Sequence, residues 1–474
     1  MSSELMPPKD WIVSDAQSYC TKIADGTHDS PKQSATGNLL VTSKNIIDGE
    51  LDLSKSYFIS EEDYSKINRR SKVDKNDVLL SMIGTVGQAC VVEQEPNFAI
   101  KNVGLLKNDD PIKAKWLYFY LSSPKAQQLI KERLKGTTQQ YLSLGEIRKL
   151  PVFYPESHDV MKRVVCFLDS LRKKIIINNS VSRTLEQMAQ ALFKSWFVNF
   201  EPVKAKMAAL EAGGSQENAT LAAMTAISGK DADALAVFER EHPEQYAELK
   251  ATAELFPSAM QESELGAIPE GWLVKPLGDS LEIKRGGSPR PIKDFIRPTG
   301  YPWVKIADAT ASISPFLFKT SEFIKEEGLK KTVYLRKGDL ILSNSATPGL
   351  PKFLQLDACI HDGWLYFPKI SNYTDTYLYF LFLKIRRELV AKGNGSVFTN
   401  LKTDILREHL AVLPECKIVN RFSVLALSYL DAIKANEITI NSLSCIRDTL
   451  LPKLLSGEIT LPEAEQAVSE TENV

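Results

Sequence analysis

One sequence unit occurs twice in this chain, and that repeat constrains the fold more than any other feature. The stretch DVLLSMIGTVG at 77–87 returns as DLILSNSATPG at 339–349. The segments that follow also match, FAIKNVGLL at 98–106 with ACIHDGWLYF at 358–367, and in the same order. Because a repeat of large period decides the architecture, the sequence predicts two copies of one domain in a single polypeptide.

Each copy ends in a long helical pattern, at 158–198 and at 416–456. Apolar residues in both helices recur at alternating steps of three and four, which is typical of a coiled-coil seam. Polar Asn178 and Ser182 interrupt the first seam, where a polar residue can fix the register. We predict that the two helices pack antiparallel; the alternative is that each packs only on its own domain. The seam residues are Val164, Leu168, Leu171, Ile175, Leu185, Ala189, Leu192 and Trp196 in the first helix, and Leu430, Ile433, Ile440, Leu443, Leu450 and Leu454 in the second.

The predicted fold class is α/β, of the α+β kind: two globular domains separated by two long antiparallel helices, with pseudo-twofold internal symmetry. DVLLSM and DLILSN are short apolar strands bounded by turns, and VTSKNIIDGELDL at 41–53 predicts a strand, an Asp-Gly turn and a strand. The acidic tail lacks periodicity and is predicted to be disordered. The predicted segments are 1–156 (first domain), 157–200 (first long helix), 201–270 (acidic helical connector), 271–415 (second domain), 416–457 (second long helix) and 458–474 (tail).

Charge is distributed unevenly along a chain whose net charge is only −1. Residues 208–270 hold 12 acidic and 3 basic side chains, and 457–474 hold 5 acidic and no basic ones, so the remainder carries +13. Local positive surface can bind phosphates even when the total charge is near zero; the alternative is an ordinary solvated face. The basic clusters are Arg69, Arg70, Lys72 and Lys75, and Lys284, Arg285, Arg290, Lys293 and Arg297.

Several classes of protein are disfavoured. With 43% hydrophobic and 25% charged residues the composition is that of a globular protein, and no run of about 18 apolar residues predicts a membrane span. The start MSSELMPPKDW does not resemble a signal peptide. The six cysteines form no CxxC pair, so neither a zinc site nor a disulfide framework is expected, and a reducing cytoplasm is the predicted compartment.

Signatures of common catalytic sites are absent from the sequence. It contains no GxxxxGK[ST] phosphate loop, no GxGxxG, no HExxH and no GxSxG. The five histidines, at 28, 158, 242, 361 and 409, do not cluster along the chain. This pattern favours binding over catalysis.

Two turns combine glycine with hydroxyl and cationic side chains, DGTHDSPK at 25–32 and KRGGSPRP at 284–291. Glycine lets backbone amides approach a phosphate, while hydroxyls and arginine can reach phosphates or base edges; the alternative is turn capping. Ser81 and Ser343 recur in both copies, which favours a role in the fold over base reading. The DNA-binding candidates are Thr27, His28, Ser30, Lys32, Lys44, Ser81, Thr85, Lys101 and Gln139 in the first copy, and Lys284, Arg285, Ser288, Arg290, Lys305, Asn344, Ser345, Thr347 and His361 in the second.

Longer motifs carry a family resemblance over residues 11–459. IADGTHDSPKQSATGNLLVTSKNIIDGELDLSKSYFISEEDY at 23–64 resembles a target-recognition domain of the specificity (S) subunits of type I restriction–modification systems, and so does RGGSPRP with GYPWVKIADAT in the second copy. LEQMAQALFKSWFVNFEPV, ESELGAIPEGW and TLLPKLLSGEI are similar to that family's central and C-terminal regions.

This resemblance implies a sequence-specific DNA-binding subunit without catalysis. Each target-recognition domain would read one half of a bipartite site in double-stranded DNA, and the paired helices would set the spacer. Methyltransferase (M) subunits would bind the helices, and Phe193, Phe197 and Phe200 are candidate contacts; the alternative is that these residues close the helix core. Restriction (R) subunits would translocate and cleave DNA. No cofactor is expected in this chain, since S-adenosylmethionine, ATP and Mg would act in the partners.

Two other functions compete with this one. A self-contained restriction endonuclease would hide a nuclease centre in one of the domains. A protein-binding tandem scaffold would use the repeats without touching DNA.

Overall fold

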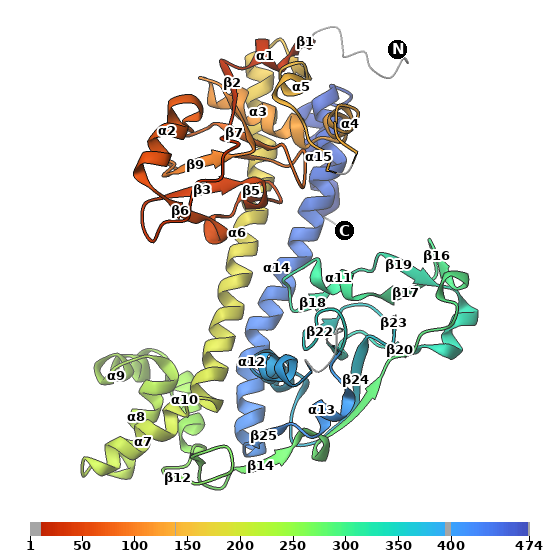
Figure 1. The fold of residues 1–474 in the computed structure, drawn as a ribbon. Helices are drawn as coiled ribbons and strands as arrows, with labels where there is room; N and C mark the ends of the chain where they lie inside the picture. The colour runs from red at the N-terminus through yellow and green to blue at the C-terminus, as the bar shows by residue number, and fades with distance from the viewer. Residues whose placement is uncertain (1–10, 138, 394–399, 473–474) are drawn as a thin grey trace. The chain divides into compact units, whose positions relative to one another are not determined.

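A computed structural model describes residues 11–137, 139–393 and 400–472, and it divides into two compact units (Figure 1). The first unit holds the chain up to Ile177 together with the segment from Thr439 onward, and the second holds Asn178–Ile438. The long helices α6 (His158–Phe197) and α14 (Cys416–Ser456) each contribute one part to each unit. No helix in the described ranges has the length and apolar character needed to cross a membrane.

The first unit is built on a four-stranded and a three-stranded sheet. The four-stranded sheet has the order β2-β10-β7-β8 and is antiparallel, while β3 and β9 are parallel neighbours in the sheet β6-β3-β9. The hairpin of β4 and β5 turns at Asp48 and Gly49, both with positive φ, as the Asp-Gly turn predicted. The strands are β1 Trp11–Asp15, β2 Lys22–Asp25, β3 Asn38–Thr42, β4 Ile46–Ile47, β5 Glu50–Leu51, β6 Tyr57–Ile59, β7 Val78–Ser81, β8 Ala89–Val91, β9 Phe98–Lys101, β10 Val103–Lys107 and β11 Pro151–Pro155.

Helices of the first unit follow their local capping signals. The Oγ of Ser60 caps α2, acidic residues occupy its first turn, and Arg69 and Arg70 lie in its last turn, an arrangement that suits the helix dipole. Asp110 caps α3, which is apolar on nearly every side and is buried accordingly. The helices are α1 Ala16–Tyr19, α2 Glu61–Ser71, α3 Pro111–Ser122, α4 Pro124–Lys131 and α5 Leu144–Arg148.

The second unit repeats this topology. Its strands β15-β24-β21-β22 stand in the order of β2-β10-β7-β8, and β17 pairs parallel with β23 as β3 does with β9. The elements are β12 Met260–Gln261, β13 Ile268–Pro269, β14 Leu273–Pro276, β15 Leu281–Arg285, β16 Ile296–Arg297, β17 Tyr301–Val304, α11 Ile306–Thr310, β18 Phe316–Leu317, β19 Glu322–Ile324, β20 Val333–Leu335, β21 Leu340–Ser343, β22 Pro351–Leu354, β23 Ala358–Ile360, β24 Trp364–Ile370, α12 Asp375–Gly393, α13 Thr403–Arg407 and β25 Leu410–Leu413.

Backbone hydrogen bonds confirm the internal repeat residue by residue. Ser81 and Ser343, singled out in the sequence, end equivalent strands and accept equivalent bonds. The matched bonds are Gly87 N to Ser81 O (3.0 Å) with Gly349 N to Ser343 O (2.8 Å), and Val92 N to Asp77 O (2.9 Å) with Leu354 N to Asp339 O (3.0 Å). The two copies therefore share one backbone frame.

Each long helix lies in the core of both units. In the first unit Leu168 of α6 and Leu454 of α14 share one core, and in the second unit Phe193 of α6 lies 5.5 Å from Phe422 of α14, ring to ring. The start of α6 thus meets the end of α14 and the reverse, so the helices are antiparallel as predicted (yellow and blue in Figure 1). Both cores also include domain residues. Buried seam residues are Val164, Leu168, Leu171, Ala189, Trp196, Leu430, Ile433, Leu450 and Leu454, while Ile175, Leu185, Leu192, Ile440 and Leu443 are half-buried.

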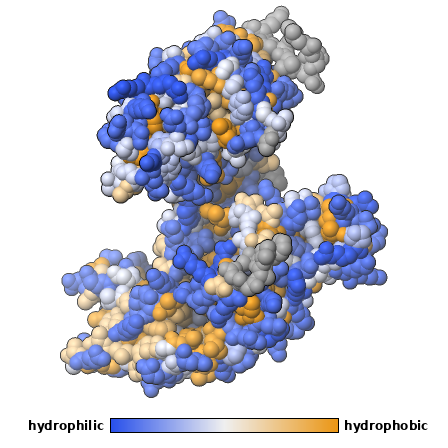
Figure 2. Space-filling view, in the orientation of Figure 1, coloured by the Kyte–Doolittle hydropathy of each residue, from blue (hydrophilic) through white to orange (hydrophobic). Residues whose placement is uncertain are grey.

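The connector forms a packed helical module. Its helices have a small core of their own that includes Met224 and Leu235, and Arg421 of α14 donates to Thr252 Oγ1 at 2.8 Å. The visible surface over α7 and α8 is largely apolar (Figure 2), which reflects their alanine-rich sequences. The interpretation of 201–270 as a solvated connector therefore missed this packing. The helices are α7 Glu201–Glu211, α8 Gln216–Ser228, α9 Ala232–Glu241 and α10 Pro243–Glu254.

The predicted disorder of 458–474 is wrong for the described part of this segment. Residues Leu461–Glu472 form helix α15, and Ala464 is buried in the core of the first unit. Ala464 has a short side chain among acidic and polar neighbours, so the composition of the segment concealed this contact.

Candidate nucleic-acid interface

In the first unit, the loop after β2 lies against the β9–β10 turn. Thr27 N donates to Ile100 O at 3.0 Å, and Gly26 is so close that a Cβ there would lie 2.3 Å from the same oxygen. Lys101 Nζ donates to Ser30 Oγ at 2.5 Å. Three predicted residues, Thr27, Ser30 and Lys101, thus come together because the glycine permits the approach.

His28 is held at the centre of this loop by both ring nitrogens. Nδ1 lies 2.9 Å from Asn102 Oδ1, and Nε2 lies 2.9 Å from Asp25 Oδ2. Arg70 donates to Gly26 O at 2.7 Å and pairs with Asp25 at 3.2 Å. The imidazole stays 63% exposed, so it is fixed in place yet accessible to a ligand.

The other candidates of the first unit are distributed over three places. Lys44 is exposed next to Ser43, whose Oγ donates to Asn102 O at 3.2 Å, and Lys32 is exposed farther along the β2–β3 loop. Thr85 is exposed in the β7–β8 loop and Gln139 in the loop after α4. Ile83 and Tyr141 form a β-bridge between those two loops, which makes them neighbours.

Ser81 is a structural residue. Its side chain is fully buried, and its Oγ donates to Ile83 O at 3.3 Å within the loop that follows β7. Ser343 is equally buried, and its Oγ donates to Thr347 O at 2.5 Å and accepts from Leu350 N at 2.9 Å. Both hydroxyls therefore hold the turn and face no solvent, so the inclusion of Ser81 among the DNA-binding candidates is wrong and the fold role expected from the repetition holds.

In the second unit the candidates converge on one carboxylate, Asp362. Ser288 Oγ donates to Asp362 Oδ1 at 2.6 Å, Arg290 pairs with Oδ2 at 3.3 Å, and Arg285 Nε donates to the Asp362 carbonyl. Burial alone would raise the pKa of this carboxyl, but the hydrogen bond from Ser288 and the nearby guanidinium groups outweigh it and lower the pKa. The charged carboxylate thus holds one hydroxyl and one cation, Arg290, while Arg285 is held by the backbone carbonyl of the same residue.

Further predicted residues surround the same turn. Asn344 Nδ2 donates to Asp362 O at 3.2 Å, and Thr347 follows Ser345 in the loop after β21. The imidazole of His361 accepts from Gly363 N at 2.8 Å, and burial lowers the pKa of this histidine.

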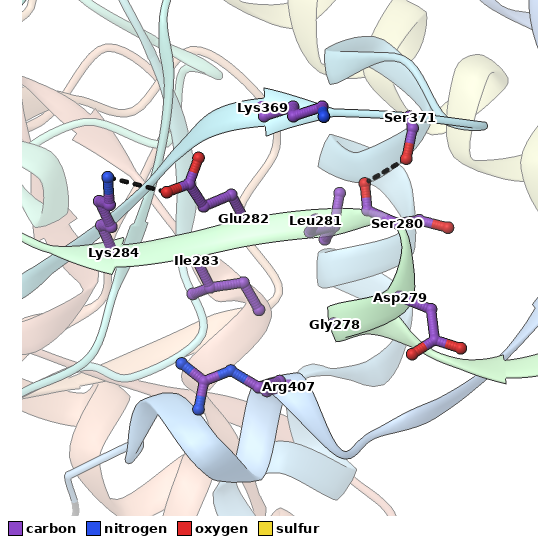
Figure 3. A pocket seen from close by; sticks show the side chains of 10 residues that line it. All are labelled: Gly278, Asp279, Ser280, Leu281, Glu282, Ile283, Lys284, Lys369, Ser371 and Arg407. Carbon is purple, nitrogen blue, oxygen red and sulfur yellow. Dashed lines mark hydrogen bonds and ion pairs between the residues drawn. The ribbon is translucent and has the colours of Figure 1, made fainter.

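The side chains of Lys305 and Lys284 pair with glutamates and not with Asp362. Lys305 pairs with Glu322 at 2.8 Å beside α11. Lys284 pairs with Glu282 at 2.8 Å in an open groove of about 590 Å³ (Figure 3). Lys369 and Arg407 also line that groove, so its wall carries mixed charge.

The prediction that Phe193, Phe197 and Phe200 contact a partner is contradicted by their burial. Phe193 and Phe197 pack on Tyr377 with ring centroids 5.2 and 4.9 Å apart, and Phe200 packs on Trp272 at 5.8 Å. All three belong to the core of the second unit, as the alternative held. An apolar helical stripe predicts burial without telling whether its own domain or another protein covers it.

Sequence reasoning missed Asn102 and Asp362, the residues around which both loops are organised. Aligning the repeats on Ile100 and Ile360 places Asn102 and Asp362 at the same position, and this signal could have found them. In the described part of the chain, no three His, Cys, Asp or Glu side chains are grouped so as to hold a metal ion.

Known proteins are similar to this chain in sequence. The sequence is 29% identical over 418 residues to the type I restriction enzyme HindI specificity subunit of Haemophilus influenzae, covering 82% of this chain and 88% of that protein. It is 22% identical over 405 residues to the MjaIX specificity subunit of Methanocaldococcus jannaschii, covering 82% and 79%.

The fold is similar to a crystal structure of a type I restriction–modification S subunit from M. genitalium. The TM-score is 0.52 at 13% identity, over 96% of this chain and 98% of that one. Residues 27–187 and 269–442 each match the family described as type I restriction modification DNA specificity domain, one match per repeat. Because these two matches span more than half of the sequence, the chain belongs to the family of type I restriction–modification DNA specificity subunits.

Proposed function

We propose that each specificity domain reads one half of a bipartite site in double-stranded DNA and that the paired helices set the spacer between the halves. The observation that carries this proposal is one backbone frame built twice, with different polar side chains on equivalent loops: His28 with Asn102, and Ser288 with Asp362. Equal frames with unequal side chains suit two half-sites of different sequence.

The chain itself supplies recognition and no catalysis. Methyltransferase subunits would modify adenine with S-adenosylmethionine, and restriction subunits would use ATP and Mg for translocation and cleavage. The endonuclease and scaffold alternatives have no specific observation in their favour.

The long helices also supply a surface for the methyltransferase subunits. Val181 and Met188 lie two turns apart on α6, so they share a face, and they are 44% and 47% exposed. On α14, Val424 and Leu427 are 58% and 43% exposed. Large apolar side chains exposed on one helix face favour a protein-binding surface, and these four replace the buried phenylalanines as the proposed contacts.

A map of adenine methylation in the source cell, with and without this gene, tests the reading function. The expected result is a split motif, two short defined halves around a fixed gap, that disappears on deletion. Loss of a contiguous motif would contradict the bipartite assignment.

Co-purification with methyltransferase subunits tests the helix surface. Leu427→Lys combined with Val424→Lys should abolish co-purification. The matched control is Val237→Lys on α9, a 40% exposed valine on another surface, which should leave the complex intact. Equal effects from both variants would refute the assignment of the surface.

A further inference from the structure

The two loop pairs occupy the same position on the repeated frame. Gly26 N donates to Val103 O and Gly286 N to Trp364 O, both at 2.9 Å, and these bonds fix the loops against equivalent strands. A Cβ on Gly286 would lie 2.2 Å from His361 O, much as one on Gly26 would lie 2.3 Å from Ile100 O.

Two residues beyond each glycine, a side chain meets the tip of the opposite turn. In the first unit this pair is His28 with Asn102 at 2.9 Å, and in the second it is Ser288 with Asp362 at 2.6 Å. The strands on both sides of the turn are therefore equivalent, whereas the turn of the second unit is one residue longer and the chemistry of the pair differs.

In the first unit the pair presents an amide. Asn102 uses Oδ1 toward His28, and its Nδ2 has no hydrogen-bond partner in the described ranges of the chain. An asparagine amide can donate to N7 and accept from N6 of adenine, a pairing that distinguishes adenine from the other bases in the major groove. Asn102 has φ +53°, a backbone conformation that places it at the tip of the turn.

In the second unit the pair presents a guanidinium. Both carboxylate oxygens of Asp362 are occupied, one by Ser288 and one by Arg290, whose side chain is 74% exposed. The carboxylate occupies one edge of the planar guanidinium group and leaves its other N–H donors available. Two such donors can bind O6 and N7 of guanine together.

We propose that this repeated position selects one base pair in each half-site: Asn102 reads an adenine through its amide, and Arg290, positioned by Asp362, reads a guanine. The inference rests on the proposed function and adds to it the residues and bases of one contact per half. Asp362 acts through Arg290 and is a positioning residue.

Binding selection from a pool of double-stranded oligonucleotides with randomised positions, using the full chain, tests the inference. Wild type should select a split motif with an adenine in one half and a guanine in the other. Asn102→Asp should change the adenine to cytosine, because a carboxylate accepts from cytosine N4, with a preference on the order of 10- to 100-fold. Arg290→Ala should remove the guanine preference by a similar factor.

Asp362→Ala should weaken the guanine preference while the other positions of that half keep theirs. A merely structural aspartate would weaken every position of the half together. Asn97→Asp, the same change at an exposed residue of the first unit, should leave the motif unaltered.

The unmodified half of each motif reports folding within the same molecule. If Asn102→Asp and Arg290→Ala both leave the wild-type motif unchanged, this inference is overturned and the proposed function stands. If wild type selects no split motif, the proposed function fails and the inference fails with it.

Discussion

Ser288 Oγ and Asp362 Oδ1 lie 2.6 Å apart although 74 positions separate the two residues in the sequence. This bond joins the loop after β15 to the turn before β24, and Arg285 and Arg290 pack on the same turn. The sequence gives no sign that Arg285, Ser288 and Arg290 interact, yet in the structure all three contact Asp362 and form one preorganised group. Preorganised donors lose less conformational entropy when a ligand binds.

Arg290→Ala should weaken DNA binding through the second half-site and spare the first. The expected loss is about 1–3 kcal/mol, the usual value of a good base contact. Footprinting on a duplex that carries both halves measures it. Arg240→Ala, at an exposed arginine on α9, is the control, and equal loss of protection at both halves would refute the assignment.

Gly26→Ala should destabilise the first unit and displace its reading loop. The new Cβ would lie 2.3 Å from the carbonyl oxygen of Ile100. This oxygen belongs to the backbone of a strand, so it cannot move aside as the end of a flexible side chain could. The expected cost is about 1–3 kcal/mol in urea unfolding, as for other overpacked sites. Gly145→Ala in α5 meets no atom within 4 Å and should be neutral or slightly stabilising, so similar losses would argue against the steric cause.

Ser343→Ala should cost more stability than Ser81→Ala. The Ser343 hydroxyl makes two hydrogen bonds, at 2.5 and 2.9 Å, whereas Ser81 makes one at 3.3 Å. Each buried bond contributes about 1 kcal/mol, so the difference should be about that size. Thermal unfolding of the two variants provides the comparison, and the reverse order would show that the hydroxyl bonds do not hold these turns.

Arg172→Met should loosen the first domain from α6. This guanidinium, with a side chain only 7% exposed, pairs with Glu50 at 2.6 Å, Asp169 at 3.0 Å and also Glu93. The cost should lie below the usual value for a broken buried pair, about 3–5 kcal/mol, because Asp169 keeps its pairs with Lys115 and Lys173 and both glutamates are more than a third exposed. Hydrogen exchange in the first unit should accelerate.

The control for Arg172 is Arg163→Met, which removes an exposed pair with Asp159 on the same helix. Surface pairs contribute about 1 kcal/mol or less, so this variant should behave like wild type. Equal acceleration in both would mean that the network does not anchor the domain.

Stability should rise with pH between about 8 and 10.5 because of Lys352. Burial lowers its pKa from 10.5 to about 8, against the raising influence of Glu186 and Glu437, and its Nζ donates to Ser312 O at 2.9 Å. In that window the unfolded chain holds a proton that the folded chain has released, so stability increases as pH increases.

Because one pKa unit corresponds to about 1.4 kcal/mol, the rise from Lys352 is at most about 3.5 kcal/mol. Chemical unfolding across this pH range should show the rise in wild type and its loss in Lys352→Met. Lys369→Met, at an exposed lysine, should keep it. A rise that persists in Lys352→Met would assign it to another group.

Local patterns were enough to predict the elements that the chain repeats. The strands β7 and β21, the Asp48–Gly49 turn and the two long helices all follow from periodicity and turn chemistry within about 40 residues of sequence. Five of the eight predicted seam residues of α6 are buried and Ile175, Leu185 and Leu192 are half-buried, since helical periodicity fixes which side chains share a face. The duplication of the domain is likewise predicted by the matching segments at 77–87 and 339–349.

Local sequence patterns do not predict which residues pack on an apolar helix face. Phe193 and Phe197 satisfy the pattern of a partner surface as well as that of a core, and only Tyr377, brought in by α12, decides between them. Acidic composition gave no indication that Ala464 would dock α15.

The sequence by itself determined the repeat, the helices and the loop residues available for recognition, because each depends on neighbours along the chain. Tertiary structure alone decided which of those residues meet. His28 reaches Asn102, and Arg290 reaches Asp362, because sheet pairing brings the turn before β10 or β24 against the loop after β2 or β15. Such contacts are non-local, and their geometry depends on strand register and on two glycines without room for a side chain.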